Sequence, residues 1–99
     1  MIIVTGHTTA SEGAEDEMSR LAVEHVLRSR SEPGCISHEV SRDLENARKL
    51  MFVEKWVDIH ALQTHIRVPE SRAFAQAMQR LTDGNLDMTI YQVDPTQKP

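Results

Sequence analysis

The chain has 99 residues, 39% of them hydrophobic and 26% charged, and its formal net charge is −4 at pH 7. Such a length makes one domain with a core near the lower limit for independent stability, which favours oligomerisation. The negative charge argues against a nucleic-acid footprint of clustered Lys and Arg, and no apolar run approaches the roughly 20 residues of a membrane span. Neither nucleic acid nor a membrane is an expected partner.

The single cysteine, Cys35, cannot form an intrachain disulfide, which is typical of proteins in a reducing compartment. The apolar start, Met1 to Val4, is too short for a signal peptide and has no basic leader. We therefore expect a cytoplasmic protein.

The first elements of the chain are a strand and a helix. Residues 2–9 are mostly β-branched and predict a strand, which Gly6 interrupts. Acidic residues that begin at Glu12 precede apolar residues at helical spacing, so a helix is predicted from about 13 to about 30. Pro33-Gly34 ends this segment.

An antiparallel hairpin is predicted next. Its first strand runs from Cys35 to about Arg42, and its second runs from Lys49 to Val57. The polar stretch 43–47 makes a connecting loop of about five residues. The pairing register is not determined by the sequence, and a slip of one residue reverses the face of every side chain.

The last third predicts a helix in two pieces and a final strand. Asp58 can cap a short helix that runs through Ile66, and Pro69 breaks it. A second, strongly amphipathic helix follows, and Leu86 to Val93 form the last strand. The amphipathic pattern is carried by Phe74, Ala77, Met78 and Leu81.

The element order β-α-β-β-α-β predicts an α+β domain of the ferredoxin-like, split-βαβ type, with one four-stranded antiparallel sheet and helices over one face. We expect it to span residues 1–94, with a loose tail at 95–99. Both faces of the first and third strands carry apolar residues. A second copy covering the open face would give a homodimeric α+β barrel.

At this point the sequence resembles the antibiotic biosynthesis monooxygenase family of dimeric α+β barrels. The resemblance covers residues 2–93 and is carried by Pro33-Gly34-Cys35, the run from Phe52 to Trp56, His65, and the helix with Phe74 after its proline. It implies a substrate cleft between sheet and helices, and the family includes small cofactor-free oxygenases of quinols and anthrones.

The sequence also departs from the family pattern. Many members carry an aromatic where His38 stands, and a His-Phe pair where this chain has Glu70-Ser71. Haem-degrading relatives have an asparagine where Gly6 aligns, so haem oxygenation is a minor interpretation.

Glu54 and Trp56 are two residues apart on the third strand, so their side chains leave the same face. With His65 on the following helix they predict a pocket suited to an aromatic substrate. The resemblance adds Phe74 as a cleft wall, and we place Phe52 among the substrate contacts. The alternatives are that Trp56 is a core or interface aromatic and that Glu54 is paired with an arginine.

Five histidines are candidates for proton transfer. His65 points inward and is the first choice for the catalytic base or proton shuttle, because an imidazole titrates near neutral pH. His38 is the second choice, since its face depends on the hairpin register. His7 faces either the cleft or the dimer interior, His25 belongs to the core stripe of its helix, and His60 faces solvent.

No metal or other cofactor is expected from the sequence. His60 and His65 are five apart, unlike the i, i+4 pair of zinc sites, and Cys35 has no cysteine partner. The glycines are scattered rather than grouped into a phosphate-binding loop or flavin fingerprint.

The leading hypothesis is a homodimeric, cofactor-independent monooxygenase that oxidises a quinol, phenol or anthrone-like substrate with O₂. One alternative is a non-catalytic dimeric barrel that binds a small apolar metabolite. Another is an isomerase or lyase of the same superfamily, which needs the same base but no oxygen.

Overall fold

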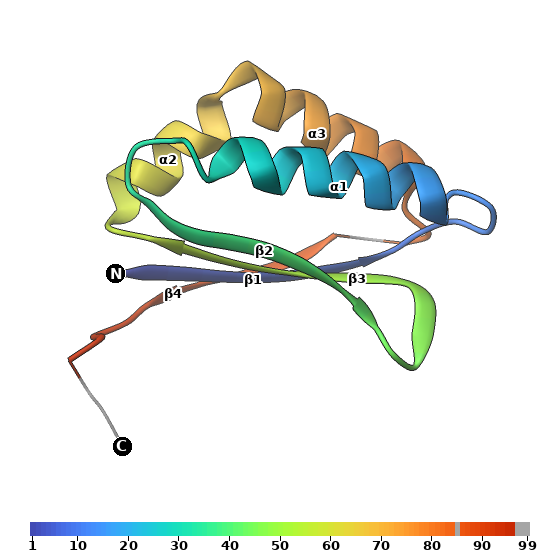
Figure 1. Cartoon of the computed structure of the whole chain (residues 1–99), viewed down its shortest axis with the longest axis horizontal. Helices are drawn as coiled ribbons and strands as arrows, with labels where there is room; N and C mark the ends of the chain where they lie inside the picture. The colour runs from blue at the N-terminus through green and yellow to red at the C-terminus, as the bar shows by residue number, and fades with distance from the viewer. Residues whose placement is uncertain (85, 97–99) are drawn as a thin grey trace.

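The computed structural model describes residues 1–84 and 86–96. Along the chain the elements follow the order β-α-β-β-α-α-β (Figure 1). They are β1 (Ile2–Thr9), α1 (Glu15–Ser29), β2 (Cys35–Asp43), β3 (Asn46–Trp56), α2 (Ile59–Arg67), α3 (Pro69–Leu81) and β4 (Asp87–Gln92).

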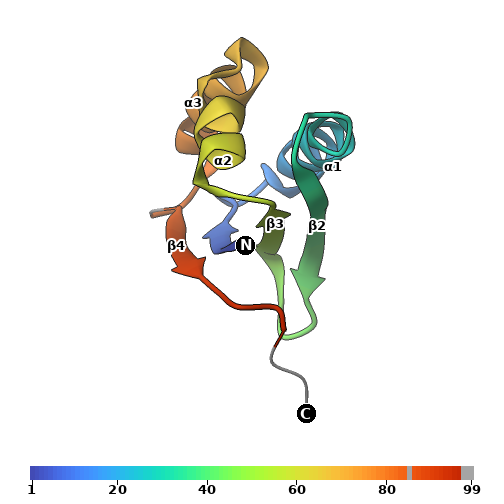
Figure 2. The same cartoon turned by 90° about the vertical axis from the view of Figure 1, so that its left-hand side faces the viewer.

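The strands form one antiparallel sheet in the order β2-β3-β1-β4. All three helices lie over the same face, with α1 above the β2 side and α2 and α3 above the β4 side (Figure 2). The predicted ferredoxin-like fold is therefore confirmed, including the division of the second helical segment at Pro69, which occupies the first turn of α3.

Several boundaries differ from the predicted ones. The hairpin loop is shorter than expected, because Asp43 pairs with Asn46 and only Leu44 and Glu45 connect the strands. The side chain of Asp43 accepts a hydrogen bond from the Glu45 amide at 2.7 Å, which replaces a longer polar loop with a local turn. Helix α1 begins two residues later than expected, and part of the predicted tail, 97–99, lies outside the described residues.

The pairing of β2 with β3 contains an irregularity at the start of β2. Cys35 lies opposite Trp56, but Ser37 lies opposite Lys55, so Ile36 is an extra residue in β2. After this bulge His38 lies opposite Glu54 on the helix-covered face. The register that the sequence left open is thereby known.

The core has two parts, both between the sheet and the helices. One lies under α1 and α3 and includes Met18, Val26, Phe52 and Met78. The other lies at the α2 end and consists of Ile2, Val4, Trp56 and Leu62. Between them the same face carries buried polar residues rather than hydrocarbon.

The opposite face of the sheet is left uncovered by the residues that the structure describes. Met51, Val53 and Tyr91 are between 39% and 47% exposed there, and every residue of β4 is exposed. Exposed apolar side chains on this face agree with the expectation that something covers it. Among the described residues, no helix is long and apolar enough to cross a membrane.

Candidate functional site

A cavity of about 670 Å³ lies between the sheet and the helices, in the range of small-molecule sites. All four strands and all three helices contribute to its lining. The walls are largely apolar and include Phe52, Leu62, Phe74, Met88 and Ile90, whereas the polar lining comes from a few buried side chains and from the exposed Arg67 and Arg72. The cavity is therefore suited to a mostly apolar ligand with a reactive polar group.

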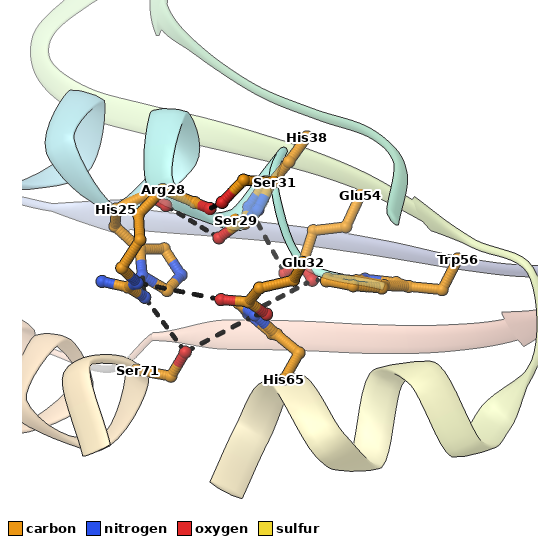
Figure 3. Close-up of polar contacts among 10 residues, drawn as sticks. All are labelled: His25, Arg28, Ser29, Ser31, Glu32, His38, Glu54, Trp56, His65 and Ser71. Carbon is orange, nitrogen blue, oxygen red and sulfur yellow. Dashed lines mark hydrogen bonds and ion pairs between the residues drawn. The ribbon is translucent and has the colours of Figure 1, made fainter. Parts of the chain in front are cut away.

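Glu54 is the carboxylate of this polar cluster and is 4% exposed. The indole Nε1 of Trp56, two residues along β3, donates a hydrogen bond to its Oε1 at 2.9 Å (Figure 3). Burial raises the pKa of Glu54, and the bond from Trp56 acts in the opposite direction. Glu54 thus takes its hydrogen bond from the neighbouring tryptophan rather than from an arginine.

His65, on α2, is held by a second carboxylate. Its Nδ1 lies 2.7 Å from Oε1 of Glu32, which belongs to the turn between α1 and β2. Because an ionised carboxylate only accepts, Nδ1 carries a proton, and Nε2 is the nitrogen left to exchange one. Nε2 lies 3.9 Å from Oε1 of Glu54. The ring therefore stands between two carboxylates, with its basic nitrogen turned to the interior.

His38, on β2, is 1% exposed and has its Nε2 3.7 Å from Oε2 of Glu54. Neither ring nitrogen has a hydrogen-bond partner among the described residues. Burial, followed by the neighbouring His65 and the nearby arginines, lowers the pKa of His38 to about 3. This imidazole is therefore neutral near pH 7.

His25 reaches the same cluster from α1. Nη2 of Arg28 lies 2.8 Å from its Nδ1, and since a guanidinium can only donate, Nδ1 accepts that bond. The ring stacks on Phe74 with centroids 4.0 Å apart and an interplanar angle of 4°. Burial is the first cause that lowers the pKa of His25 to about 3. The same Nη2 donates to Ser71 at 3.1 Å.

Most of the residues predicted for the site do meet here. His65, His38, Glu54, Phe74 and Phe52 all line the cavity.

Trp56 is not a wall of the cavity. It is fully buried in the second core cluster beside Leu62, and it adjoins the site through its bond to Glu54 and its ring, whose centroid is 4.7 Å from that of His65. The interpretation of this tryptophan as a core aromatic fits its position in that cluster.

The two remaining histidines, His7 and His60, are both exposed. His60 is exposed, as predicted. His7 lies on the open face of β1, where it is exposed and 3.4 Å from Asp87. It is therefore outside the cavity.

Sequence reasoning missed Glu32, Arg28 and Ser71, and it assigned His25 to the core alone. Glu32 precedes the Pro33-Gly34 turn and carries no periodic signal that would place it near α2. Arg28 and His25 are three apart on α1, a spacing that joins side chains on one helix face and could have drawn attention to the pair. Ser71 stands directly in the first turn of α3.

The arrangement can accept a proton and stabilise the resulting cation. His65 offers a free Nε2 inside an apolar cavity, and the carboxylates of Glu32 and Glu54 flank the ring. Nucleophilic chemistry at Cys35 is not favoured, because burial raises the pKa of its thiol. The geometry is therefore that of general acid–base chemistry on a small, mostly apolar molecule.

The chain is similar to known sequences over most of its length. Residues 1–77 match the family model described as antibiotic biosynthesis monooxygenase. An uncharacterized protein of Synechocystis sp. is 29% identical over 96 residues, which cover 97% of this chain. The chain spans 65% of the length of that curated relative.

Solved structures share the whole fold. A protein of Deinococcus radiodurans, provisionally named an antibiotic biosynthesis monooxygenase, superposes with a TM-score of 0.93 at 26% identity, over 100% of this chain and 98% of that one. A conserved protein of Methanosarcina mazei has a TM-score of 0.88 at 25% identity, over 94% of this chain and 92% of its own.

Proposed function

The chain belongs to the antibiotic biosynthesis monooxygenase family, and from this premise we propose that it is a homodimeric, cofactor-independent monooxygenase of a small aromatic substrate. The substrate class is a quinol, phenol or anthrone. The observation that supports this most directly is His65, whose Nδ1 is bound to Glu32 at 2.7 Å and whose Nε2 is free within an apolar cavity.

Dioxygen reacts slowly with closed-shell organic molecules, whereas a substrate anion can give it one electron. In the proposed reaction Nε2 of His65 removes a proton from the substrate, and the anion transfers an electron to O₂. The two radicals combine into a peroxide, which takes up the proton from the imidazolium and loses water. For an anthrone, the CH₂ group and O₂ become a carbonyl and H₂O, so atoms and electrons balance.

The other residues of the cavity have distinct tasks in this proposal. Glu32 fixes the tautomer of His65, and Glu32 and Glu54 together stabilise the imidazolium. Phe74 and Phe52 hold the aromatic rings of the substrate, and the apolar lining keeps bulk water from the anion. His38, neutral near pH 7, is better suited to hydrogen-bonding the substrate than to removing its proton.

A second copy of the chain completes the protein in this proposal. It would cover the open sheet face, where Met51, Val53 and Tyr91 are exposed. Sedimentation equilibrium would test this part independently of activity, and a monomer at assay concentrations would contradict it.

The activity is tested by oxygen uptake of the chelator-treated protein with menadiol and with anthrone. A no-enzyme reaction corrects for autoxidation. We expect uptake well above this control, falling by about a hundredfold or more in His65→Ala, the size of a general-base contribution. His60→Ala is the matched control, because His60 is an exposed histidine on the same helix.

Two results would contradict the proposal. One is wild-type uptake equal to autoxidation for every quinol and anthrone tested. The other is an equal rate in His65→Ala and His60→Ala, which would separate the reaction from this cavity. Turnover without oxygen consumption would instead support the isomerase or lyase alternative.

A further inference from the structure

Three histidines from three different elements meet at the inner end of the cavity. They are His25 on α1, His38 on β2 and His65 on α2, and each is at most 6% exposed. One ring nitrogen from each lies within 4.8 Å of the other two. Linear spacing does not reveal this trio, because its members lie on three elements that are far apart in the chain.

The rings are spaced as a metal ion would space them. Their centroids are 5.1, 5.3 and 5.7 Å apart. Three imidazoles on a tetrahedral zinc ion, with bonds of about 2.0–2.1 Å, have centroids roughly 5 Å apart and nitrogens roughly 3.4 Å apart. Movements of about 1 Å by the side chains would therefore bring the nitrogens into bonding positions.

An independent observation points to a ligand. His38 is almost completely buried, yet neither of its ring nitrogens has a hydrogen-bond partner among the described residues. A buried polar atom without a partner costs free energy, so such a group calls for an explanation. Its Nε2 is turned toward the carboxylate of Glu54, at 3.7 Å.

The surroundings of His65 are those of a metal ligand. Histidines that bind metals usually donate their other ring N–H to a carboxylate, which orients the ring and raises its basicity. Glu32 accepts that bond from Nδ1 of His65 at 2.7 Å, and Nε2 remains free. Glu54, 3.9 Å from Nε2 of His65, supplies a carboxylate to complete four-fold coordination.

We propose that His25, His38 and His65, with Glu54 as fourth ligand, form a binding site for a divalent transition-metal ion of the Zn²⁺ type. Arg28 is the competing group, because it donates to Nδ1 of His25. Its second partner, Ser71, and its neighbour Glu32 give the guanidinium an alternative position when the ion binds.

Metal binding also has a consequence that rests on the function proposed above. Nε2 of His65 cannot bind a metal ion and accept a substrate proton at the same time. Bound Zn²⁺ therefore inhibits the proposed oxygenase reaction. Binding itself does not depend on that function, so it is tested without substrate.

The direct experiment is titration of the chelator-treated full chain with Zn²⁺ by calorimetry, and with Co²⁺ by visible absorption. We expect one ion per chain and the intense visible bands of four-coordinate Co²⁺. Substitution by glutamine at each of the three positions (His25→Gln, His38→Gln, His65→Gln) weakens Zn²⁺ binding by about tenfold or more. His60→Gln, on exposed helix surface, leaves the affinity within about twofold.

Glu32→Gln provides a separate readout, because it removes the charge that orients His65 without removing a ligand. It should weaken binding by about tenfold to a hundredfold, the usual effect of an outer-shell partner. An unchanged affinity in His38→Gln or His65→Gln would overturn the assignment. So would equal losses in these variants and in His60→Gln.

A measurement on the wild type covers the case in which a variant does not fold. Long-range proton–nitrogen spectra of the imidazole rings, recorded with and without Zn²⁺, should shift for His25, His38 and His65. The signals of His7 and His60 should stay in place. Shifts confined to the two exposed histidines, or no binding by the folded protein, would refute the site.

Discussion

Glu32 and His65 are 33 positions apart in the chain, and a hydrogen bond of 2.7 Å joins Oε1 of the first to Nδ1 of the second. The bond ties the turn before β2 to helix α2 and fixes which nitrogen of His65 faces the cavity. It also brings a negative charge next to the ring, where a cation forms if the ring takes a proton.

Replacement of Glu32 by glutamine should slow the proposed reaction by about tenfold to a thousandfold, because the imidazolium loses its carboxylate partner. Steady-state oxygen uptake measures the effect. Glu24→Gln, which breaks the exposed pair with Arg20 on α1, is the control. Equal rates in the two variants would exclude the positioning role of Glu32.

Phe74→Leu should raise KM for an aromatic substrate several-fold and change kcat little, because Phe74 is a wall of the cavity and not a proton carrier. The stacking of Phe74 on His25 is lost in this variant. Leucine keeps most of the apolar volume, so the fold is retained. A large fall in kcat at unchanged KM would contradict this role.

Trp56→Phe should act on stability rather than on substrate affinity. It removes the Nε1–H that donates to Glu54 at 2.9 Å and leaves a buried carboxyl oxygen without that donor. The expected loss is about 1–3 kcal/mol of unfolding free energy, with a further rise in the pKa of Glu54. Denaturant unfolding measures the loss of unfolding free energy. An unchanged midpoint would show that the hydrogen bond from Trp56 to Glu54 does not contribute to stability.

Stability should fall as the pH is lowered from about 6.5 toward 3. The fold lowers the pKa of His25 and of His38 from the ordinary histidine value of 6.5 to about 3. Between these pH values the unfolded chain therefore binds more protons than the folded chain, and protonation favours unfolding. The raised pKa of Glu54 has the opposite sign, because the folded state then holds a proton more readily, and it offsets part of the loss. Denaturation midpoints at about pH 7 and about pH 4.5 should differ less in His38→Gln than in His60→Gln.

Gly34→Ala should destabilise the protein far more than Gly13→Ala. Both glycines have positive φ, 81° and 88°, so both variants incur a backbone cost of about 1 kcal/mol. A Cβ at Gly34 would lie 2.6 Å from Cβ of Ala61 and 2.9 Å from Cγ2 of Val57, whereas at Gly13 nothing lies within 4 Å. Equal unfolding free energies in the two variants would mean that α2 moves aside easily.

The fold could be predicted because its signals are local. Three local signals indicate the elements in order: the alternation in the strands, the amphipathic pattern around Phe74, and the breaks in secondary structure at Pro33-Gly34 and Pro69. The hairpin loop was predicted too long, since the polar residues after Asp43 look like loop but continue the ladder at Asn46. Hydrogen bonds between strands, rather than composition, decide where such a strand begins.

The candidate site could be predicted only in part. Glu54 and His65 follow from the alternation of a strand and the inward face of a helix, and both line the cavity. Glu32, Arg28 and Ser71 come from a turn and from helix ends that the fold brings together, and a contact such as Glu32 to His65 has no sequence period. The grouping of His25 with the other two histidines is of the same kind.

The extra residue at Ile36 has a consequence for how such a site can be gained or lost. If the pairing of Cys35 with Trp56 continued into β2 without the bulge, Ser37 would lie opposite Glu54, and His38 would lie opposite Val53 on the open face of the sheet. Every β2 side chain beyond the bulge would change faces in the same way. The bulge therefore decides whether β2 supplies an imidazole to the cavity, while the lining from the other strands and the helices stays in place.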